Sequence, residues 1–358
     1  MQKNKKRKIK LDKNINNTFK KMNIIYIFLG LFILSFQKVE QDEKFQEFIE
    51  YTKKYNKNYS SPEEFQSRFQ IWKKNYNQIK RNNPTSFLSK GKNVGAKFGI
   101  NQFSDMTEEE FKSKYLTFDP DMYRDLAPLT TIDLDLDDIE PPESFDWELD
   151  KGIKSEVKHQ KDCGGCWAFA TTSTLEAQYQ ILTGKNILFS EQQLIDCDEN
   201  NLKCNGGNMK KAFLYLQDHG LMKSEDYPFK NGEGECKYNE KKTVIKVKEF
   251  SFVPKDEEEM KKALFKYGPL AGAVNGIMMA SYENGIYEPY PSYICPDSVN
   301  HAIVIVGYGV DKETKKKFWR IKSSWGPEWG ENGYFRLIRG EEACGIKRYT
   351  LLPFIEEL

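Results

Sequence analysis

Cysteine content constrains the fold of this chain more than any other feature of its sequence. The chain has seven cysteines, at positions 163, 166, 197, 204, 236, 295 and 344. Because seven is an odd number, at least one of them cannot pair within the chain. The spacing of Cys163 and Cys166 is that of a redox pair or of half a zinc site. Both readings are disfavoured, because no second pair at this spacing follows and no convincing strand precedes the first.

The chain begins with a basic leader and a short hydrophobic segment. Residues 1–21 contain nine Lys or Arg and one acid, and residues 24–36 are mostly apolar. This order matches a secretory signal, and the apolar segment is shorter than the about 20 residues that a membrane span needs. A nuclear-localisation reading of the basic run is disfavoured because the hydrophobic segment follows it directly. We predict a leader and signal peptide over residues 1–37, with a signal anchor, or a start at Met22, as alternatives.

The overall composition excludes several classes of protein. The chain has 54 basic and 53 acidic side chains, so we expect no nucleic-acid partner. Hydrophobic residues make up 39% of it, which is enough for a core and argues against a disordered chain. Three histidines are too few for a His-rich metal protein, and we expect no metal and no cofactor. Export would place the cysteines where disulfides form.

A helix that starts at a cysteine is predicted after Gly164 and Gly165. Residues 166–182 contain no Gly or Pro and carry apolar residues at helical steps. Cys166 would then lie at the helix N-terminus, where the positive end of the helix dipole favours a thiolate. Because the thiolate is the nucleophilic form, Cys166 is our candidate nucleophile.

A cysteine nucleophile needs a base, and histidine is the side chain suited to that role near neutrality. His159 lies beside Gln160, within the same motif as the cysteine. His219 ends a predicted helix between residues 207 and 220, where a histidine is typical of a cap. His301 begins an apolar strand, which would be a rigid platform, and is therefore our candidate base.

Two patterns precede the cysteines. Apolar residues recur at helical spacing over residues 45–52, and a second helix is predicted to start after Pro62. Along it, six residues follow one another at steps of four, four, three, four and four: Glu64, Arg68, Trp72, Asn75, Ile79 and Asn83. About sixteen residues later comes Gly99-x-Asn101-x-Phe103-x-Asp105. The mixture of charged, aromatic and amide side chains on one helical stripe is unusual for an ordinary core face.

Together these features resemble the papain family of cysteine proteases, of the cathepsin L-like kind, over residues 42–353. The helical stripe is similar to the ERFNIN helix of papain-family propeptides, with Trp72 in place of the usual Phe, and residues 99–105 are similar to their G-x-N-x-F-x-D motif. Cys163-Gly-Gly-Cys166-Trp is similar to the family signature C-G-[SA]-C-[WY], with Gly165 as a departure. His301 lies 135 residues after Cys166, within the signature's range of about 130–150.

The resemblance implies two further catalytic positions. Gln160 corresponds to the oxyanion donor, acting with the Cys166 backbone N–H. Ser323 stands where the family has the Asn that accepts a hydrogen bond from the imidazole. Because Ser is shorter, we expect that either a water between Ser323 and His301 or a shift of the imidazole ring is needed. Losing one orienting hydrogen bond would cost about 1–3 kcal/mol, or roughly ten- to a hundredfold in rate. Asn332 is the only nearby amide, but it falls at a structural turn and is not assigned the role.

The resemblance also implies where a substrate binds. Gly206 and Gly207 are similar to the strand that hydrogen-bonds the substrate backbone, where glycines permit close approach. The second pocket would be lined by Met209, Ala273, Val299, Ala302 and Tyr349, and Trp325 would shield the histidine. Most of these side chains are apolar, so we expect an apolar residue two positions before the cut, in a pocket made shallow by Tyr349. No His-containing insertion similar to an occluding loop is present, which favours an endopeptidase.

Disulfides and fold follow from the same resemblance. Family positions imply the pairs Cys163–Cys204, Cys197–Cys236 and Cys295–Cys344, which leaves Cys166 free, whereas spacing alone leaves many pairings open. The implied fold is α+β, with a helical left lobe and a β-barrel-like right lobe behind a helical propeptide. Helical signals dominate residues 166–220. Strand signals cover residues 243–253, 270–274, 302–307, 317–324 and 333–338.

We therefore expect a cysteine-type endopeptidase made as a zymogen, with an inhibitory propeptide over residues 38–137 and a mature domain over 138–358. The propeptide would run backwards through the cleft, and the acidic segment 117–140 is predicted to be an exposed, cleavable linker. Expected partners are protein and peptide substrates, the propeptide itself and cystatin-type inhibitors, with the enzyme a monomer in the secretory pathway, either in a lysosome or acidic vacuole or outside the cell. The alternative, motivated by Ser323, is an impaired family member that binds peptides or inhibitors.

Overall fold

The computed structural model describes residues 43–83, 95–120, 133–289 and 295–358. The predicted leader, signal segment and middle of the predicted linker lie outside these residues. The chain divides into two compact units, residues 1–75 and 76–358, and each is described by itself. Among the described residues, no helix combines the length and the apolar character that crossing a membrane requires.

The described part of the first unit contains helix α2 (Phe45–Lys54) and most of helix α3 (Pro62–Asn82). Both helices were predicted from the sequence and are confirmed. Their contact is aromatic: the Phe48 ring is fully buried, 5.3 Å from Phe69 and 5.6 Å from Trp72. Aromatic pairs at these separations stabilise a small core beyond the area that they bury. Ser61 Oγ accepts a hydrogen bond from the Glu64 backbone N–H at 3.2 Å, which caps the start of α3.

A nine-stranded sheet forms the framework of the second unit, within the described residues. In order across the sheet, the strands are β3 (Leu221–Met222), β4 (Thr243–Phe252), β11 (Thr350–Glu357), β5 (Leu270–Val274), β8 (His301–Val310), β9 (Lys317–Lys322), β10 (Tyr334–Ile338) and β7 (Ile286–Tyr287). The ninth strand, β2 (Phe145–Asp146), pairs with β8. A separate two-stranded sheet joins β1 (Lys97–Phe98) to β6 (Tyr282–Asn284).

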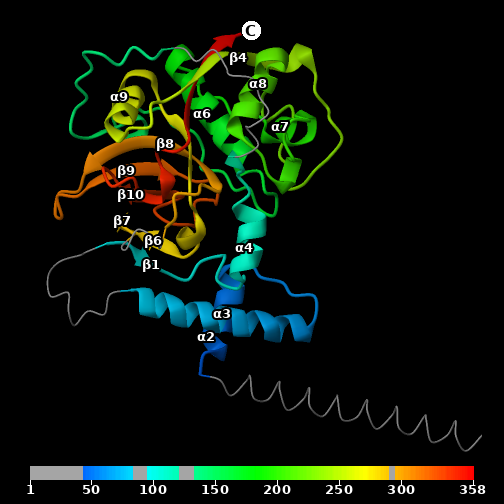
Figure 1. Ribbon diagram of the computed structural model, residues 1–358. Helices are drawn as coiled ribbons and strands as arrows, with labels where there is room; N and C mark the ends of the chain where they lie inside the picture. The colour runs from blue at the N-terminus through cyan, green and yellow to red at the C-terminus, as the bar shows by residue number, and fades with distance from the viewer. Residues whose placement is uncertain (1–42, 84–94, 121–132, 290–294) are drawn as a thin grey trace, which may run out of the picture. The chain divides into compact units, whose positions relative to one another are not determined.

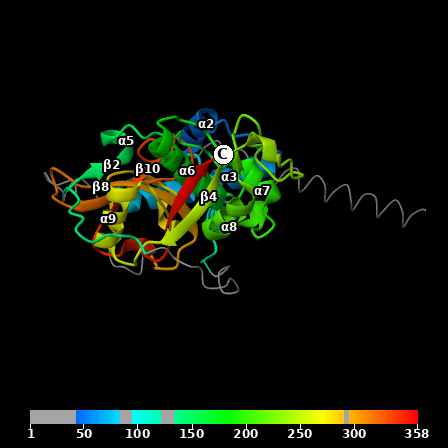
Figure 2. The same ribbon diagram turned by 90° about the horizontal axis from the view of Figure 1, so that it is seen from above.

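Helices lie on both sides of this framework. They are α4 (Glu108–Tyr115), α5 (Trp147–Asp150), α6 (Cys166–Thr183), α7 (Glu191–Cys197), α8 (Met209–His219) and α9 (Glu257–Tyr267). In Figure 1, α6, α7 and α8 gather at one side of the unit, and strands β8, β9 and β10 lie at the other, near α9. Figure 2, from above, shows the same separation of α7 and α8 from β8 and α9. The predicted α+β, two-lobe papain-like fold is confirmed.

Strand β8 is shared by two hydrophobic cores. Its residues from His301 to Gly309 are all buried, so the strand lacks the alternation of a half-exposed strand. Because side chains alternate across a strand, Ile303 and Ile305 pack in the core of the strand-rich lobe, whereas Ala302 and Val304 pack in the core of the helical lobe. One strand therefore positions residues in both lobes.

Three disulfides cross-link the second unit. They join Cys163 to Cys204, Cys197 to Cys236 and Cys295 to Cys344, as the resemblance implied, and Cys166 is the free cysteine. The first two lie in the helical lobe and the third in the strand-rich lobe. The prediction that segment 117–140 is exposed holds for most of residues 133–140 but is wrong at Phe118 and Leu136, which are only 3% and 5% exposed. Both side chains are apolar and lie in hydrophobic cores, which explains their burial.

Candidate active site

The start of α6 brings a thiol to the boundary between the two lobes. Cys166 is the first residue of the helix, and the Gly165 backbone precedes it as the N-cap. Close approach requires the neighbouring glycine, since a Cβ on Gly164 would lie 2.3 Å from the Cys204 carbonyl oxygen. The predicted helix and the position of Cys166 at its N-terminus are therefore confirmed.

The thiol of Cys166 is fully buried, and part of the cover comes from Thr117. Thr117 Oγ1 lies 3.7 Å from Cys166 Sγ and donates a hydrogen bond to the Gly164 carbonyl at 2.8 Å. Burial raises the pKa of the Cys166 thiol, and hydrogen bonds from the backbone of Ala302 and from Thr117 offset part of that rise. In this covered state the thiol is neutral, even though it lies at a helix N-terminus.

His301 lies across this boundary, at the first residue of β8. Its Nδ1 is 3.1 Å from the Tyr115 carbonyl oxygen, and its Nε2 is 3.1 Å from Ser323 Oγ. Its ring stacks on Trp325 with a centroid separation of 4.4 Å. Burial lowers the pKa of His301 to about 3, so the imidazole is neutral here.

The hydrogen-bond roles at this neutral ring follow from its neighbours. A carbonyl oxygen only accepts, so the single ring proton lies on Nδ1 and is donated to Tyr115. The Ser323 hydroxyl then donates to Nε2. Of the two expected ways to bridge the shorter side chain, an intervening water is not needed, because Ser323 Oγ and His301 Nε2 are in direct hydrogen-bond contact. The shifted ring stays a prediction.

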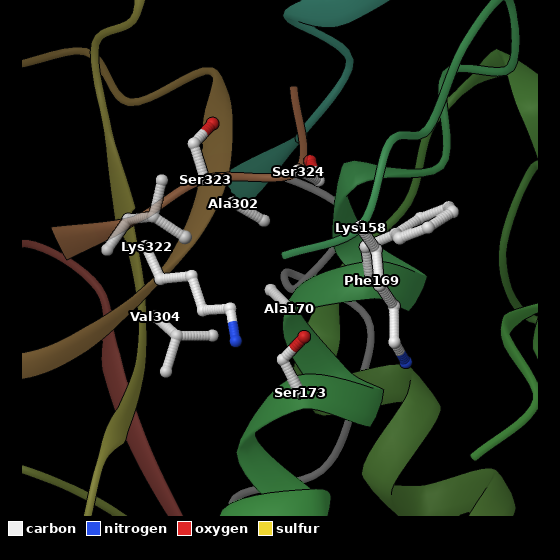
Figure 3. A pocket seen from close by; sticks show the side chains of 10 residues that line it. Lys158, Phe169, Ala170, Ser173, Ala302, Val304, Lys322, Ser323 and Ser324 are labelled. Atoms are coloured by element: carbon white, nitrogen blue, oxygen red, sulfur yellow. The ribbon is translucent and has the colours of Figure 1, made fainter. Parts of the chain in front are cut away.

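A small pocket lies beside Ser323, and the charged side chains of Lys158 and Lys322 are part of its lining. In Figure 3, Ser323 and its neighbour Lys322 point in opposite directions, Lys322 toward Ser173 of α6. Lys322 Nζ donates to the Ser155 carbonyl at 2.6 Å and lies 3.6 Å from the Glu148 carboxylate. These contacts hold the end of β9, and with it Ser323, in place against the imidazole.

The Gln160 amide lies near the thiol and is fully buried. Its Nε2 donates to the Cys163 carbonyl at 3.0 Å and is 3.5 Å from the Lys114 carbonyl. Its Oε1 accepts a hydrogen bond from Ser324 Oγ at 2.7 Å. Ser324 was not among the predicted site residues, although its position next to Ser323 could have indicated it.

Residues 115–119, which we call the covering segment, follow α4 and pass over the thiol and the imidazole. The Gly207 N–H donates to the Thr117 carbonyl, and the Gly207 carbonyl accepts from the Asp119 N–H, both at 3.3 Å. The pairing of Phe118 with Gly207 is parallel. Glycine is required at Gly206 too, where a Cβ would lie 2.3 Å from the Thr117 carbonyl oxygen and φ is +124°.

The Phe118 side chain is buried in the hydrophobic core of the helical lobe, beside this backbone pairing. All five side chains predicted for the second pocket belong to the same buried cluster as Phe118: Met209, Ala273, Val299, Ala302 and Tyr349. The Phe118 ring lies edge-on to Tyr349, with centroids 4.7 Å apart. The predicted pocket residues thus share a hydrophobic core with Phe118, and their role as a substrate pocket stays a prediction.

An aromatic cluster, Phe103, Phe111, Tyr115, Trp325 and Trp329, lies on the other side of the covering segment. Phe103 is 5.7 Å and Phe111 5.2 Å from Trp325. Trp329 packs edge-on against Trp325 at 4.6 Å. The G-x-N-x-F-x-D motif thus supplies, through Phe103, an anchor for the segment that follows α4. Trp325 itself contacts both this cluster and the His301 ring.

Comparison with known proteins agrees with this arrangement. Residues 141–354 match the papain family cysteine protease domain, and residues 48–111 match the cathepsin propeptide inhibitor domain I29. The chain is 40% identical over 310 residues to a cathepsin L-like proteinase of Fasciola hepatica, covering 84% of this chain and 90% of that protein. It is 34% identical over 353 residues to cysteine proteinase 1 of Dictyostelium discoideum, covering 93% of this chain and 100% of that protein.

Solved structures show the same likeness. The fold matches digestive procathepsin L 3 of Tenebrio molitor larval midgut with a TM-score of 0.77 at 30% identity, covering 87% of this chain and 99% of that one. It also matches the recombinant stem bromelain precursor with a TM-score of 0.75 at 34% identity, covering 87% and 99% of the two chains. Both are precursor structures, in agreement with a chain that carries its own propeptide.

Proposed function

Because the chain belongs to the papain family of cysteine proteases and carries a cathepsin-type inhibitory propeptide, we propose that Cys166 and His301 are its nucleophile and its base. One observation carries this proposal. Four residues within the stretch 114–118 together contact Gln160, His301, Cys166 and the predicted substrate pocket: Lys114, Tyr115, Thr117 and Phe118. An inhibitory propeptide has to cover the catalytic groups and the substrate pocket together.

Removal of the covering segment would change the charge state of the pair. Water would reach the thiol and the imidazole, so the burial that raises the pKa of Cys166 and lowers that of His301 would be relieved. The proton would then pass from the thiol to the imidazole, and the helix dipole would stabilise the thiolate. The resulting thiolate attacks the carbonyl carbon of the scissile peptide bond.

The remaining steps use groups that already surround the pair. Gln160 Nε2 and the Cys166 backbone N–H would stabilise the oxyanion of the tetrahedral intermediate. The imidazolium of His301 would protonate the leaving amine, and the acyl-enzyme would be hydrolysed by a water activated by the then neutral imidazole. Ser324 would orient the Gln160 amide throughout, because its hydroxyl donates to the amide oxygen. One amide N–H bonds the Cys163 carbonyl; the other faces the Lys114 carbonyl and would become free for the oxyanion when the propeptide leaves.

Ser323 would serve His301 in both charge states. In the covered state its hydroxyl donates to the neutral ring at Nε2. An imidazolium has N–H donors on both nitrogens, so in the active state the same oxygen would accept. A hydroxyl makes this change by rotating its hydrogen, whereas an amide has to turn over. The direct contact therefore supports a working enzyme rather than the impaired peptide-binding alternative.

The direction of the covering segment explains why it is not a substrate. It runs parallel to residues 206–208, a short stretch that forms an isolated β-bridge at Gly207 and that we call the substrate strand. We expect a substrate to pair with the same glycine in the opposite direction, so the covering segment would present its peptide bonds to Cys166 in reverse. The apolar pocket around Phe118 supports a preference for an apolar residue two positions before the cut.

We retain the proposed boundaries of a leader over residues 1–37, a propeptide over 38–137 and a mature domain over 138–358. Three disulfides support passage through the secretory pathway. Destination, whether a lysosome, an acidic vacuole or the cell exterior, stays a prediction, as do a monomeric state and inhibition by cystatin-type proteins.

Cleavage of a dipeptide-amide fluorophore after acid activation tests the proposal, with a thiol-directed covalent inhibitor as the second readout. The wild-type chain should cleave the fluorophore and be inactivated by the inhibitor. Cys166→Ala should do neither, and Ser323→Ala should retain reduced activity. A correctly folded wild-type protein that is inert to both reagents would support the peptide-binding alternative instead.

A further inference from the structure

A buried carboxylate lies outside the proposed catalytic groups, at the end of α7. Asp198 is only 1% exposed. Its oxygens accept hydrogen bonds from the Asn200 backbone N–H at 3.0 Å and from Asn201 Nδ2 at 2.6 Å. Among the described residues, no cation lies within salt-bridge distance of it. Burying a carboxylate without a paired cation costs free energy. The hydrogen bonds that Asp198 accepts therefore have to offset this cost.

Asn201 connects Asp198 to the strand that carries Gly207, because its side chain hydrogen-bonds the backbone of Asn208. Its Oδ1 accepts from the Asn208 N–H at 2.8 Å, and its Nδ2 is 3.3 Å from the Asn208 carbonyl oxygen. A Cβ on Gly207 would lie 2.6 Å from the same Oδ1, so the amide is packed directly against the glycine. The next residue, Leu202, donates its N–H to the Gly206 carbonyl at 2.9 Å.

The opposite edge of this strand faces the covering segment and the pocket. Gly207 bonds the covering segment through both of its backbone groups. Asn208 Nδ2 donates to the Asp119 carbonyl at 3.1 Å, and Asn208 Oδ1 accepts from the Tyr349 hydroxyl. The strand is therefore held on one edge by Asn201 and binds a peptide backbone with the other.

We propose that Asp198 is a positioning residue for substrate binding: it fixes the Asn201 amide, which fixes the backbone of Gly207 and Asn208 for hydrogen bonding to a peptide. Asp198 touches neither the peptide nor the reacting atoms. The proposal rests on the proposed function, because it takes Gly207 as the substrate strand. It adds that the binding edge and the Tyr349 side of the pocket are set by one buried carboxylate.

The test separates peptide binding from thiol chemistry in the full chain after acid activation. Asp198→Asn keeps the size of the side chain but has one acceptor oxygen for two donors. We expect the KM for an extended peptide substrate to rise on the order of tenfold, as for the loss of one hydrogen bond to a charged group. The rate at which iodoacetamide alkylates Cys166 should stay within about twofold, because this small reagent does not use the strand.

Two further variants keep the test decisive. Asp196→Asn, on the same helix, removes a buried carboxylate that bonds Tyr227 and Gly234 instead of the strand, and should lower thermal stability without a selective rise in KM. The exchange Asp198→Asn with Asn201→Asp restores a donor–acceptor pair between the two positions and should recover most of the KM. If the single variant does not fold, the exchange still tests the link.

The outcomes are distinguishable. An unchanged KM in Asp198→Asn, or an alkylation rate that falls together with kcat/KM, would overturn the positioning role. A lack of recovery in a folded exchange variant would overturn the Asn201 link. A wild-type chain that neither cleaves peptides nor reacts at Cys166 would instead overturn the proposed function, before any variant is compared.

Discussion

The covering segment is held by two regions that differ in kind. On the helical lobe it forms backbone hydrogen bonds to Gly207 and buries the single ring of Phe118 against Tyr349. On the strand-rich lobe it adjoins the aromatic cluster around Trp325. Backbone bonds on their own contribute little net free energy, because water replaces them on release, whereas buried aromatic rings contribute much more. The aromatic contacts therefore supply most of the affinity with which the covering segment is held, and the backbone hydrogen bonds fix the direction in which it runs.

The strongest way to break this comparison is to remove an aromatic anchor. Phe103 lies 4.8 Å from Tyr115, 5.1 Å from Phe111 and 5.7 Å from Trp325. Phe103→Ala should cost about 3–5 kcal/mol of packing and release the covering segment. Alkylation of Cys166 by iodoacetamide in the unprocessed chain should then accelerate by two orders of magnitude or more.

The matched control is Phe145→Ala. Phe145 is a buried aromatic residue of the same core that packs against Trp147 and Phe265. It should lower the free energy of unfolding by a similar amount and leave Cys166 protected. Equal exposure of the thiol in both variants would contradict a specific anchor.

Lowering the pH tests the two kinds of contact separately, because His301 titrates in the acidic range and the aromatic rings do not. The pKa of His301 is about 3 in the covered chain against an ordinary value of 6.5. Below pH 6.5 the unfolded chain binds a proton that covered His301 does not bind, so stability is present above that pH and is lost as pH falls. The free energy of unfolding should drop by up to about 1.4 kcal/mol per pH unit.

Denaturant unfolding of Cys166→Ala, which cannot process itself, measures this slope between pH 7 and 4. The double variant Cys166→Ala with His301→Gln provides the baseline, because buried carboxyl groups also titrate in this range. The difference between the two curves is assigned to His301. Parallel curves would show that His301 is not buried in a neutral form.

A smaller effect is expected from the hydroxyl of Ser323. Ser323→Ala removes both its donor and its acceptor role toward His301, and should lower kcat roughly tenfold with little change in KM. Ser323→Asn should keep the activity at or above that of the wild type. Fluorophore hydrolysis by the activated enzymes measures both, and a fully active Ser323→Ala would remove Ser323 from the site.

The smallest effect should come from the polar side of the cover. Thr117→Val keeps the shape of the side chain and removes the hydrogen bond to the Gly164 carbonyl. The loss of about 0.5–1.5 kcal/mol should raise the alkylation rate of Cys166 in the unprocessed chain by tenfold or less. Ser113→Ala, whose hydroxyl bonds only its own helix at Glu110, should leave the rate unchanged.

Local sequence rules accounted for much of the site. Gly164 and Gly165 followed by a run without Gly or Pro predicted α6, and an apolar run predicted β8 at His301. Strand β11 was missed because Pro353 interrupts its pattern, and proline is disfavoured inside a sheet. The structure accommodates it because β11 pairs with β5 only at Thr350 and Leu351 and beyond them pairs with β4.

Long-range contacts were not predictable from the sequence alone. Ser324 holds Gln160 across a separation of 164 residues, and no local pattern marks such a pair. No sequence pattern marks Asp198 or Asn201, since their importance comes from what they are packed against. The burial of Phe118 was missed because an acidic, loop-like stretch indicates exposure unless a pocket is known to receive one of its residues.

The pairing at Gly207 has a consequence for what the enzyme can digest. Under the proposed function, a substrate peptide that binds at Gly207 has to offer a free N–H and a free carbonyl in an extended conformation, and neither is available in a helix or inside a sheet. A folded protein therefore becomes a substrate only through segments that open locally. We expect the rate at which a substrate protein is digested to follow its local opening equilibrium more closely than its sequence. The stability of the substrate protein then decides how fast it is degraded.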